Sequence, residues 1–173
     1  MHWVDLYVSE LERSIMKNDF KSFKMLLIRG DTCKDMMHLI IKQNANIDFI
    51  ELVLSREPSL VDSIDNNGKT PLHYAADFSQ IEILLKYDAR YIQDNGGFTP
   101  LDRLQYMKEV FIKNHERETA TLMKQNPFMK MKWIQPNKDE MDKKLEKIKK
   151  CEDLLFNAGC RYSVYKNLNL KEN

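Results

Sequence analysis

The chain has 173 residues, of which 43% are hydrophobic and 31% are charged, which is enough apolar material for one domain with a buried core. Its net charge of +1 excludes a protein that is strongly basic or acidic throughout. Three cysteines without a Cys-x-x-Cys pair argue against a disulfide framework or a zinc knuckle and indicate a reducing compartment. No apolar run approaches about 18 residues and acids occur early in the chain, so we expect neither a membrane span nor a secretory signal.

The charge is unevenly distributed. Between Lys124 and Lys150 there are nine lysines and four acidic residues, a local balance of +5, while the rest of the chain has a balance of −4. A molecule polarised in this way can present two faces to two kinds of partner.

The first 62 residues show two helical patterns. Residues 9–30 contain a small residue in the first half and a leucine pair followed by Gly30 in the second. Residues 31–62 contain two apolar runs, at 37–41 and 49–54. Both segments are interpreted through the motif that follows them, because each resembles a weaker copy of the same repeat.

A stronger motif follows. The pattern Asp-x-x-Gly-x-Thr-Pro-Leu begins at Asp65 and again at Asp94, 29 residues later. Gly68 permits the positive φ of a tight turn. Thr70 is placed to cap a helix whose first turn holds Pro71, where the missing N–H costs nothing.

These repeated residues resemble the ankyrin-repeat signature. The resemblance implies an all-α fold, an ankyrin-repeat solenoid of helix-turn-helix repeats with short hairpin tips and, here, a helical insertion in the last repeat. We expect a single domain over 1–173 with end repeats that act as caps and hence a complete small protein. The repeats are expected at about 9–30, 31–62, 65–93 and 94–165. The third repeat lacks the family's turn glycine and about three residues, so we expect its second helix to be short or irregular.

The fourth repeat is interrupted. Its first helix starts at Thr99, but the matching leucine pair ends only at Leu155, followed by Asn-Ala-Gly-Cys, which resembles the family's ending. About 38 residues, near 108–145, are therefore extra relative to a spacing of roughly 18 in the family. Apolar spacing predicts two long helices, with a bend bracketed by 126–127 and 135–137. They either form an antiparallel arm or fold back over the stack and its groove.

Catalytic chemistry is not indicated. In ankyrin repeats the histidine at the position of His73 bonds within and between hairpin tips, and His38 and Asp102 occupy the equivalent places. No His or Cys cluster has metal-ligand spacing, and no nucleophile elbow or phosphate-binding glycine loop is present. We therefore expect no enzyme activity, no cofactor and no metal.

The resemblance implies that a partner protein contacts the hairpin tips and the exposed side of the first helices, which line a concave groove. Phe98 either contacts a partner or packs on the neighbouring tip, and Phe78 either contacts a partner or fills the shortened turn. The candidate protein-binding residues are Asn66, Asn67, Lys69, Asp77, Phe78, Asn95, Phe98, Tyr106 and Met107.

A second candidate surface lies between two prolines, at 127–136. It alternates apolar side chains with lysines, and Trp133 either pins the arm to the repeats or docks on a partner, an acidic protein or an anionic lipid surface. The candidate residues for this second contact are Phe128, Lys130, Lys132, Trp133 and Ile134.

Three functions compete. The first is a non-catalytic adaptor that binds an unidentified protein. The second is binding of nucleic acid or an anionic surface by the basic segment 124–150, against which 20 lysines to 7 arginines and interleaved acids argue. The third is a module of an enzyme, receptor or channel. Abundant Lys, Asn and Ile suggest an AT-rich genome, such as that of an intracellular microbe or virus. We expect an intracellular monomer, cytoplasmic or, as a host-directed effector, in the host cytoplasm.

Overall fold

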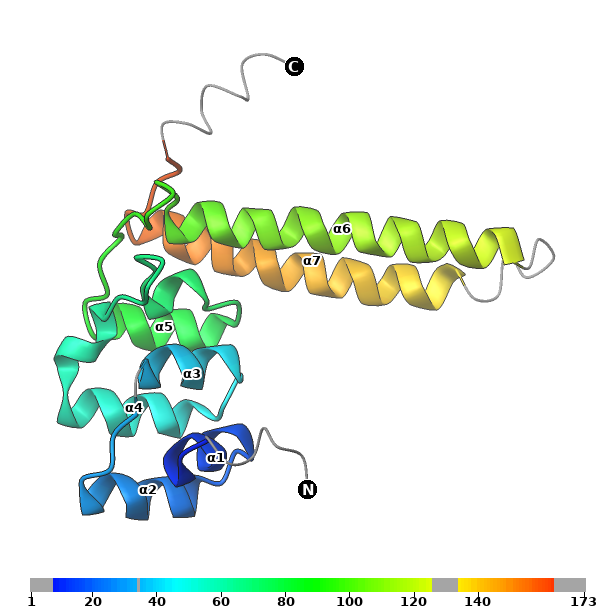
Figure 1. Cartoon of the computed structure of the whole chain (residues 1–173). Helices are drawn as coiled ribbons and strands as arrows, with labels where there is room; N and C mark the ends of the chain where they lie inside the picture. Colours follow the sequence, from blue (N-terminus) through cyan, green and yellow to red (C-terminus); the bar gives the residue numbers. More distant parts are fainter. Residues whose placement is uncertain (1–7, 34, 126–133, 164–173) are drawn as a thin grey trace.

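The computed structural model describes residues 8–33, 35–125 and 134–163, and the regular elements within these ranges are all helical (Figure 1). The all-α class expected from the sequence is therefore confirmed. In chain order the α-helices and short 3-10 helices (η) are α1 (Glu10–Met16), α2 (Phe20–Arg29), α3 (Met36–Lys42), α4 (Ile47–Arg56), η2 (Pro58–Asp62), η3 (Pro71–His73), α5 (Phe78–Lys86), α6 (Pro100–Gln125) and α7 (Ile134–Asn157).

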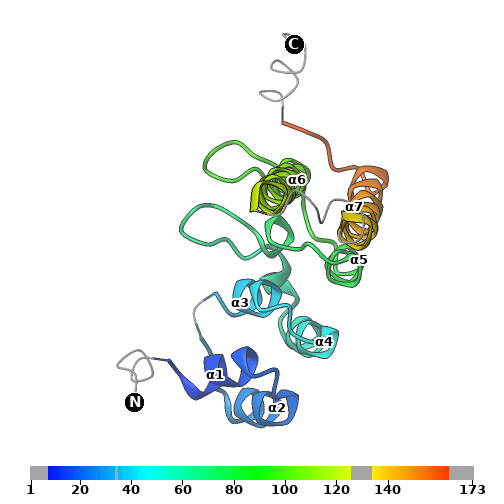
Figure 2. The same cartoon turned by 90° about the vertical axis from the view of Figure 1, so that its right-hand side faces the viewer.

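The helices stack in two layers. Seen along the helices, α1, α3 and the start of α6 form one layer, and α2, α4, α5 and α7 form the other (Figure 2). Successive members of each layer pack on one another, with η3 between α3 and α6 in the first layer. Two hairpin loops project from the first layer, away from the second (Figure 2). Since α6 follows η3 and α7 follows α5, the two long helices continue the pattern of the stack.

Apolar side chains between the layers form one continuous core. Phe23 and Phe49 are fully buried with ring centroids 4.7 Å apart, and they join the first two helix pairs. Leu84 of α5 and Leu155 of α7 are also fully buried. Burying a side chain of this size contributes about 1.5–3 kcal/mol. One leucine from each predicted pair of the third and fourth repeats therefore lies in the core, while Phe23 and Phe49 fill it in the first two repeats.

Three second-layer helices end in the same way. At the ends of α2, α5 and α7 a residue of positive φ (Gly30, Asp88 and Gly159) is followed by an N–H that bonds five residues back. These bonds join Asp31 to Leu26, Ala89 to Leu84 and Cys160 to Leu155. This is the Schellman arrangement, which uses carbonyls that a helix end would otherwise leave unpaired. The end of α7 is thus built like the ends of the earlier repeats, as its sequence suggested.

The expectation for the third repeat was wrong. Its second helix, α5, is regular over nine residues, whereas its first helix is the three-residue 3-10 helix η3. The reason is Asp77, whose side chain accepts a hydrogen bond from the Ser79 N–H at 2.9 Å and so caps α5. A strong N-cap so soon after His73 starts the second helix and leaves the first no room to extend.

The long helices α6 and α7 form an antiparallel pair that extends beyond the ends of the other helices (Figure 1). Two long helices in this region were predicted. Seen end-on, they lie above the stack and do not cross the side from which the hairpin loops project (Figure 2). The described part of the arm therefore extends, and the alternative in which it folds over the groove is wrong for these residues.

One boundary of the arm differs from the prediction. Residues 135–137 were expected to mark the end of the bend, but α7 already begins at Ile134, so Pro136 lies in its first turn. The first N–H groups of a helix have no partner within it, so a proline there removes no helical hydrogen bond.

Candidate functional site

The hairpin tips are joined by a buried polar ladder. His73 is 3% exposed; its Nδ1 accepts from the Thr70 N–H at 3.1 Å and its Nε2 lies 3.0 Å from the carbonyl oxygen of Phe98 in the next tip. Because Nδ1 is an acceptor, Nε2 carries the proton and donates. Burial lowers the pKa of His73, although the bond to Phe98 acts in the opposite direction. The structural role expected for His73 is confirmed.

The same position recurs in the neighbouring repeats. Nε2 of His38 lies 2.8 Å from the carbonyl oxygen of Lys69. Asp102 accepts from the Thr99 N–H at 2.9 Å, and its carboxylate also accepts from the Ser163 N–H at 3.0 Å. Each of these side chains therefore bonds its own repeat to the next segment, while the buried Nδ1 of His38 has no hydrogen-bond partner among the described residues.

Each tip is closed by an aspartate. Asp65 accepts from the N–H groups of Asn67 and Lys69 at 2.8 and 3.0 Å and from the Tyr74 hydroxyl at 2.7 Å. Partial burial raises the pKa of Asp65, but these hydrogen bonds outweigh that effect and lower it to about 2. The carboxylate is therefore ionised at neutral pH and holds the tip in one shape.

The two tips also bond directly. The Asn95 N–H donates to the Asn67 carbonyl at 2.9 Å, and the Asn95 side-chain amide donates to the Asn66 carbonyl at 3.3 Å. A Cβ on Gly68, whose φ is +72°, would lie 2.3 Å from Asn95 Oδ1. Gly68 is therefore required for the close approach of the tips as well as for its turn. The three predicted asparagines lie on one ridge, with part of their polar surface already used.

Phe98 is the most prominent of the predicted residues. Its side chain stacks on Arg103, whose guanidinium carbon lies 5.0 Å from the ring centroid, yet it is still 42% exposed. Arg103 is fixed by two bonds to Asp94 Oδ2, and Asp94 in turn accepts the Phe98 N–H at 3.1 Å. Gly96 leaves the space that the ring occupies. Phe98 therefore packs within its own tip and still offers a rigid aromatic face.

The exposed apolar surface continues onto α6. Tyr106 and Met107 are 58% and 42% exposed, and they follow Arg103 by three and four residues, which places them on the same side of the helix. The structure thus groups Phe98, Tyr106 and Met107 around Arg103. The sequence predicted Phe98, Tyr106 and Met107 but not Arg103. Arg103 could have been found from its position, because a residue four places after Thr99 lies in the first turn of the helix that follows the tip.

Two predicted residues lie elsewhere in the repeat than expected. Asp77 caps α5 and Phe78 is the first residue of that helix, so neither belongs to the first helix of its repeat. Phe78 is 42% exposed. Their contact with a partner stays a prediction, and the structure places both residues at the start of the second helix of the repeat.

A second cluster surrounds Tyr74, which the sequence analysis did not select. Nζ of Lys42 lies 4.0 Å from the ring centroid of Tyr74, and Nζ of Lys69 lies 5.3 Å from it. Burial raises the pKa of Tyr74 to about 12, and the hydrogen bond that its hydroxyl donates to Asp65 acts in the same direction. The signal that could have found this cluster is the aromatic residue directly after the His73 position.

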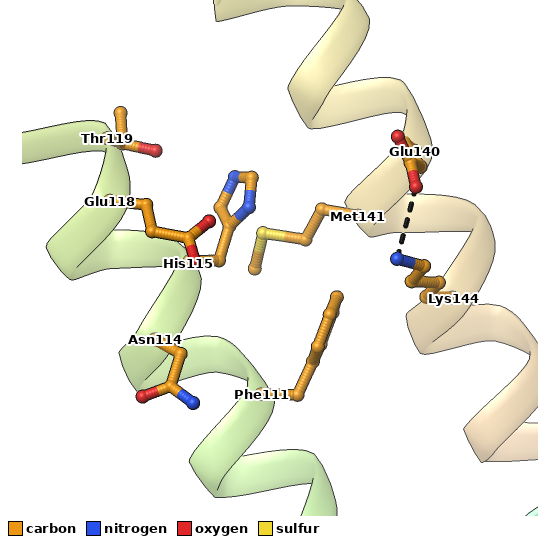
Figure 3. Close-up of a pocket in the computed structure, with 8 residues that line it drawn as sticks. All are labelled: Phe111, Asn114, His115, Glu118, Thr119, Glu140, Met141 and Lys144. Carbon is orange, nitrogen blue, oxygen red and sulfur yellow. Dashed lines mark ion pairs between the residues drawn. The ribbon is translucent and has the colours of Figure 1, made fainter. Parts of the chain in front are cut away.

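The arm has a cleft of its own. A cavity of about 360 Å³ lies between α6 and α7, where Phe111 and Met141 point toward each other beside His115 (Figure 3). Lys144 pairs with Glu140 at 3.1 Å, and its Nζ is 5.3 Å from the Phe111 ring centroid. The predicted second contact lies outside the described residues, which include neither Phe128, Lys130, Lys132 and Trp133 nor the side chain of Ile134.

The described residues contain no group of three or more metal-ligating side chains. Cys151 and Cys160 are buried, and burial raises the pKa of Cys151 to about 11 and also raises that of Cys160. Both thiols are therefore protonated at neutral pH and are poor nucleophiles. Among the helices of the described ranges, none has the length and apolar character that crossing a bilayer demands.

These features define a helical repeat protein with ordered hairpin tips. Residues 11–95 match the family model for ankyrin repeats, in three copies. The chain therefore contains ankyrin repeats, which the family model locates in residues 11–95. Ankyrin repeats are protein-interaction modules and are typically non-enzymatic. No curated protein matches the sequence.

Proposed function

We propose that this protein is a non-catalytic adaptor that binds a partner protein through its hairpin tips and concave groove. The observation that carries the proposal is Phe98, a 42% exposed aromatic ring held in place by Arg103 and Asp94. Binding energy at interfaces is concentrated in a few such residues, and a ring that is already fixed loses little entropy on binding.

The surrounding surface has the composition of an interface. Asn66, Asn67, Lys69 and Asn95 supply a polar rim on the tips, and Tyr106 and Met107 extend the apolar area on α6. A typical specific interface buries about 800 Å² per partner, which this ridge and the adjoining first-layer helices can supply. The proposed location is intracellular, either in the cytoplasm or, for a host-directed effector, in the cytoplasm of the host.

The basic arm is less favourable as the main binding surface. Within this segment, Lys144 and Lys150 pair with Glu140 and Glu146 one turn earlier. Paired lysines of this kind usually keep a helix soluble and contribute little else. Binding of nucleic acid or an anionic surface is therefore an outcome of the test below.

The test is quantitative capture of partners from a cell lysate, read by mass spectrometry at low and high salt. The baits are the wild-type chain, Phe98→Ala and, as a matched control, Phe156→Ala. Phe156 is 49% exposed and stacks on Arg161 at 4.4 Å, but it lies on α7, in the other layer. The proposal predicts a discrete protein that Phe98→Ala loses and that Phe156→Ala retains at high salt. Equal capture by both variants, or salt-labile capture of nucleic acid, would contradict it.

A further inference from the structure

Two lysines from different repeats converge on one aromatic ring, that of Tyr74. Lys42 ends α3, and Lys69 lies in the tip of the next repeat, yet their ammonium groups are 4.0 and 5.3 Å from the ring centroid of Tyr74. Neither forms an ion pair with an acid of the described ranges. The contacts with the ring hold the two charges in place without neutralising them.

The acids closest to this cluster already have partners. Asp65 accepts three hydrogen bonds, from the N–H groups of Asn67 and Lys69 and from the Tyr74 hydroxyl. Asp94 of the next tip is held by Arg103. A carboxylate that shapes a tip cannot turn toward the lysines without breaking these bonds. The positive charge at Lys42 and Lys69 is therefore open to an acid from outside the chain.

The positive cluster continues into the aromatic surface of the proposed site. The tip that holds Lys69 bonds to the tip that holds Phe98 through the Asn95 N–H and the Asn67 carbonyl. From one tip to the next, the order is thus a pair of cations on Tyr74, then the Phe98 ring on Arg103, then Tyr106 of α6. A ligand that lies along this line meets positive charge at one end and apolar surface at the other.

We propose that the segment bound in this groove is an acidic peptide of the partner protein, with its carboxylates at Lys42 and Lys69 and an apolar side chain at Phe98. This inference rests on the proposed function, since it names the chemistry of the partner for the same surface. Charge complementarity of this kind speeds the encounter and fixes the register of the bound segment.

The experiment selects ligands without assuming their charge. Random 12-residue peptides displayed on phage are selected on the full chain, and the selected peptides are synthesised with a fluorophore. Their affinities are measured by fluorescence anisotropy for the wild type and for the double variant Lys42→Gln/Lys69→Gln. The control is Lys143→Gln/Lys147→Gln, two exposed lysines of α7 that give the same change of charge on the arm. Circular dichroism verifies that both variants are folded.

The expected result is a set of peptides enriched in Asp and Glu that also carry an apolar residue. The Lys42/Lys69 variant should bind them about tenfold more weakly, a typical loss for two partly exposed ion pairs, and the arm variant should bind as the wild type does. Peptides without acidic enrichment, equal loss in both variants, or no 12-residue peptide with a Kd below about 100 µM would overturn the inference. The affinity of Phe98→Ala is measured with the same peptides. If peptides without acidic enrichment are selected and bind Phe98→Ala more weakly than the wild type, the proposed function still stands. If Phe98→Ala binds every selected peptide as the wild type does, the proposed function and this inference both fail.

Discussion

Replacing His73 tests the polar ladder that orders the hairpin tips. The neighbouring repeat has an aspartate at the same position, and Asp102 caps its own helix while it accepts the Ser163 N–H at 3.0 Å. A four-atom side chain can therefore span both contacts. At His73, however, the group across the interface is the carbonyl oxygen of Phe98, which needs a donor. Asp and Asn at this position have the same shape and differ in that asparagine can donate.

The expected cost follows from this difference. In His73→Asn the amide can donate to Phe98, whereas in His73→Asp an ionised carboxylate would face a carbonyl oxygen at a site that is 3% exposed. A buried acceptor without a donor costs about 1–3 kcal/mol, so we expect His73→Asp to be about 2 kcal/mol less stable than His73→Asn at pH 7. With a urea m-value of about 2 kcal/mol/M, the two unfolding midpoints would differ by about 1 M.

The assay is urea unfolding followed by far-UV circular dichroism at pH 7 and pH 5. At pH 5 the difference between the variants should shrink, because the buried carboxyl can take up a proton and then donate it to Phe98. Coincident midpoints at pH 7 would refute the reasoning, since they would mean that the His73 bond to Phe98 has no preference for a donor.

Three further predictions concern the tips. Burial lowers the pKa of His73 in the folded chain, so the unfolded chain binds more protons and the free energy of unfolding should fall as pH drops below about 6.5. In urea titrations from pH 8 to 5, His73→Asn should lose this dependence on pH. An unchanged dependence would contradict the burial of a neutral His73. Gly68→Ala should cost about 1–3 kcal/mol in thermal unfolding, from its positive φ and the clash with Asn95, and a neutral effect would show that the tips are looser than the structure has them. Tyr74→Phe removes a hydrogen bond that lowers the pKa of Asp65 and should move that pKa upward from about 2, measured by NMR titration, with the loss of stability in acid shifted to higher pH; an unmoved pKa would contradict it.

The fold was largely predictable because its signals are local. The motif at Asp65 and Asp94 contains the turn glycine, the cap and the helix-starting proline, and the buried leucines recur at repeat spacing. The shortening of the third repeat was predicted for its second helix, but it falls on the first. The prediction failed because Asp77 caps α5 through a local hydrogen bond that residue spacing alone does not reveal.

The candidate site was only partly predictable. Phe98 could be chosen as an exposed aromatic residue of a tip, but its support by Arg103 and Asp94 depends on side chains that meet in three dimensions. The cluster of Lys42 and Lys69 on Tyr74 joins two repeats, and no pattern within one repeat contains it. Contacts between repeats are set by the packing of the layers, which the sequence specifies only indirectly.

The central claim is that the partner binds on the tips and the first-layer helices, and site-specific photocrosslinking tests it most directly. A benzophenone amino acid is placed at Asn67 or Tyr106 on the proposed surface and at Ser55 or Glu82, exposed positions of α4 and α5 in the other layer. The account predicts that the captured partner crosslinks from Asn67 and Tyr106 and not from Ser55 or Glu82. Crosslinks confined to Ser55 and Glu82 would contradict it and place the binding surface on the opposite face.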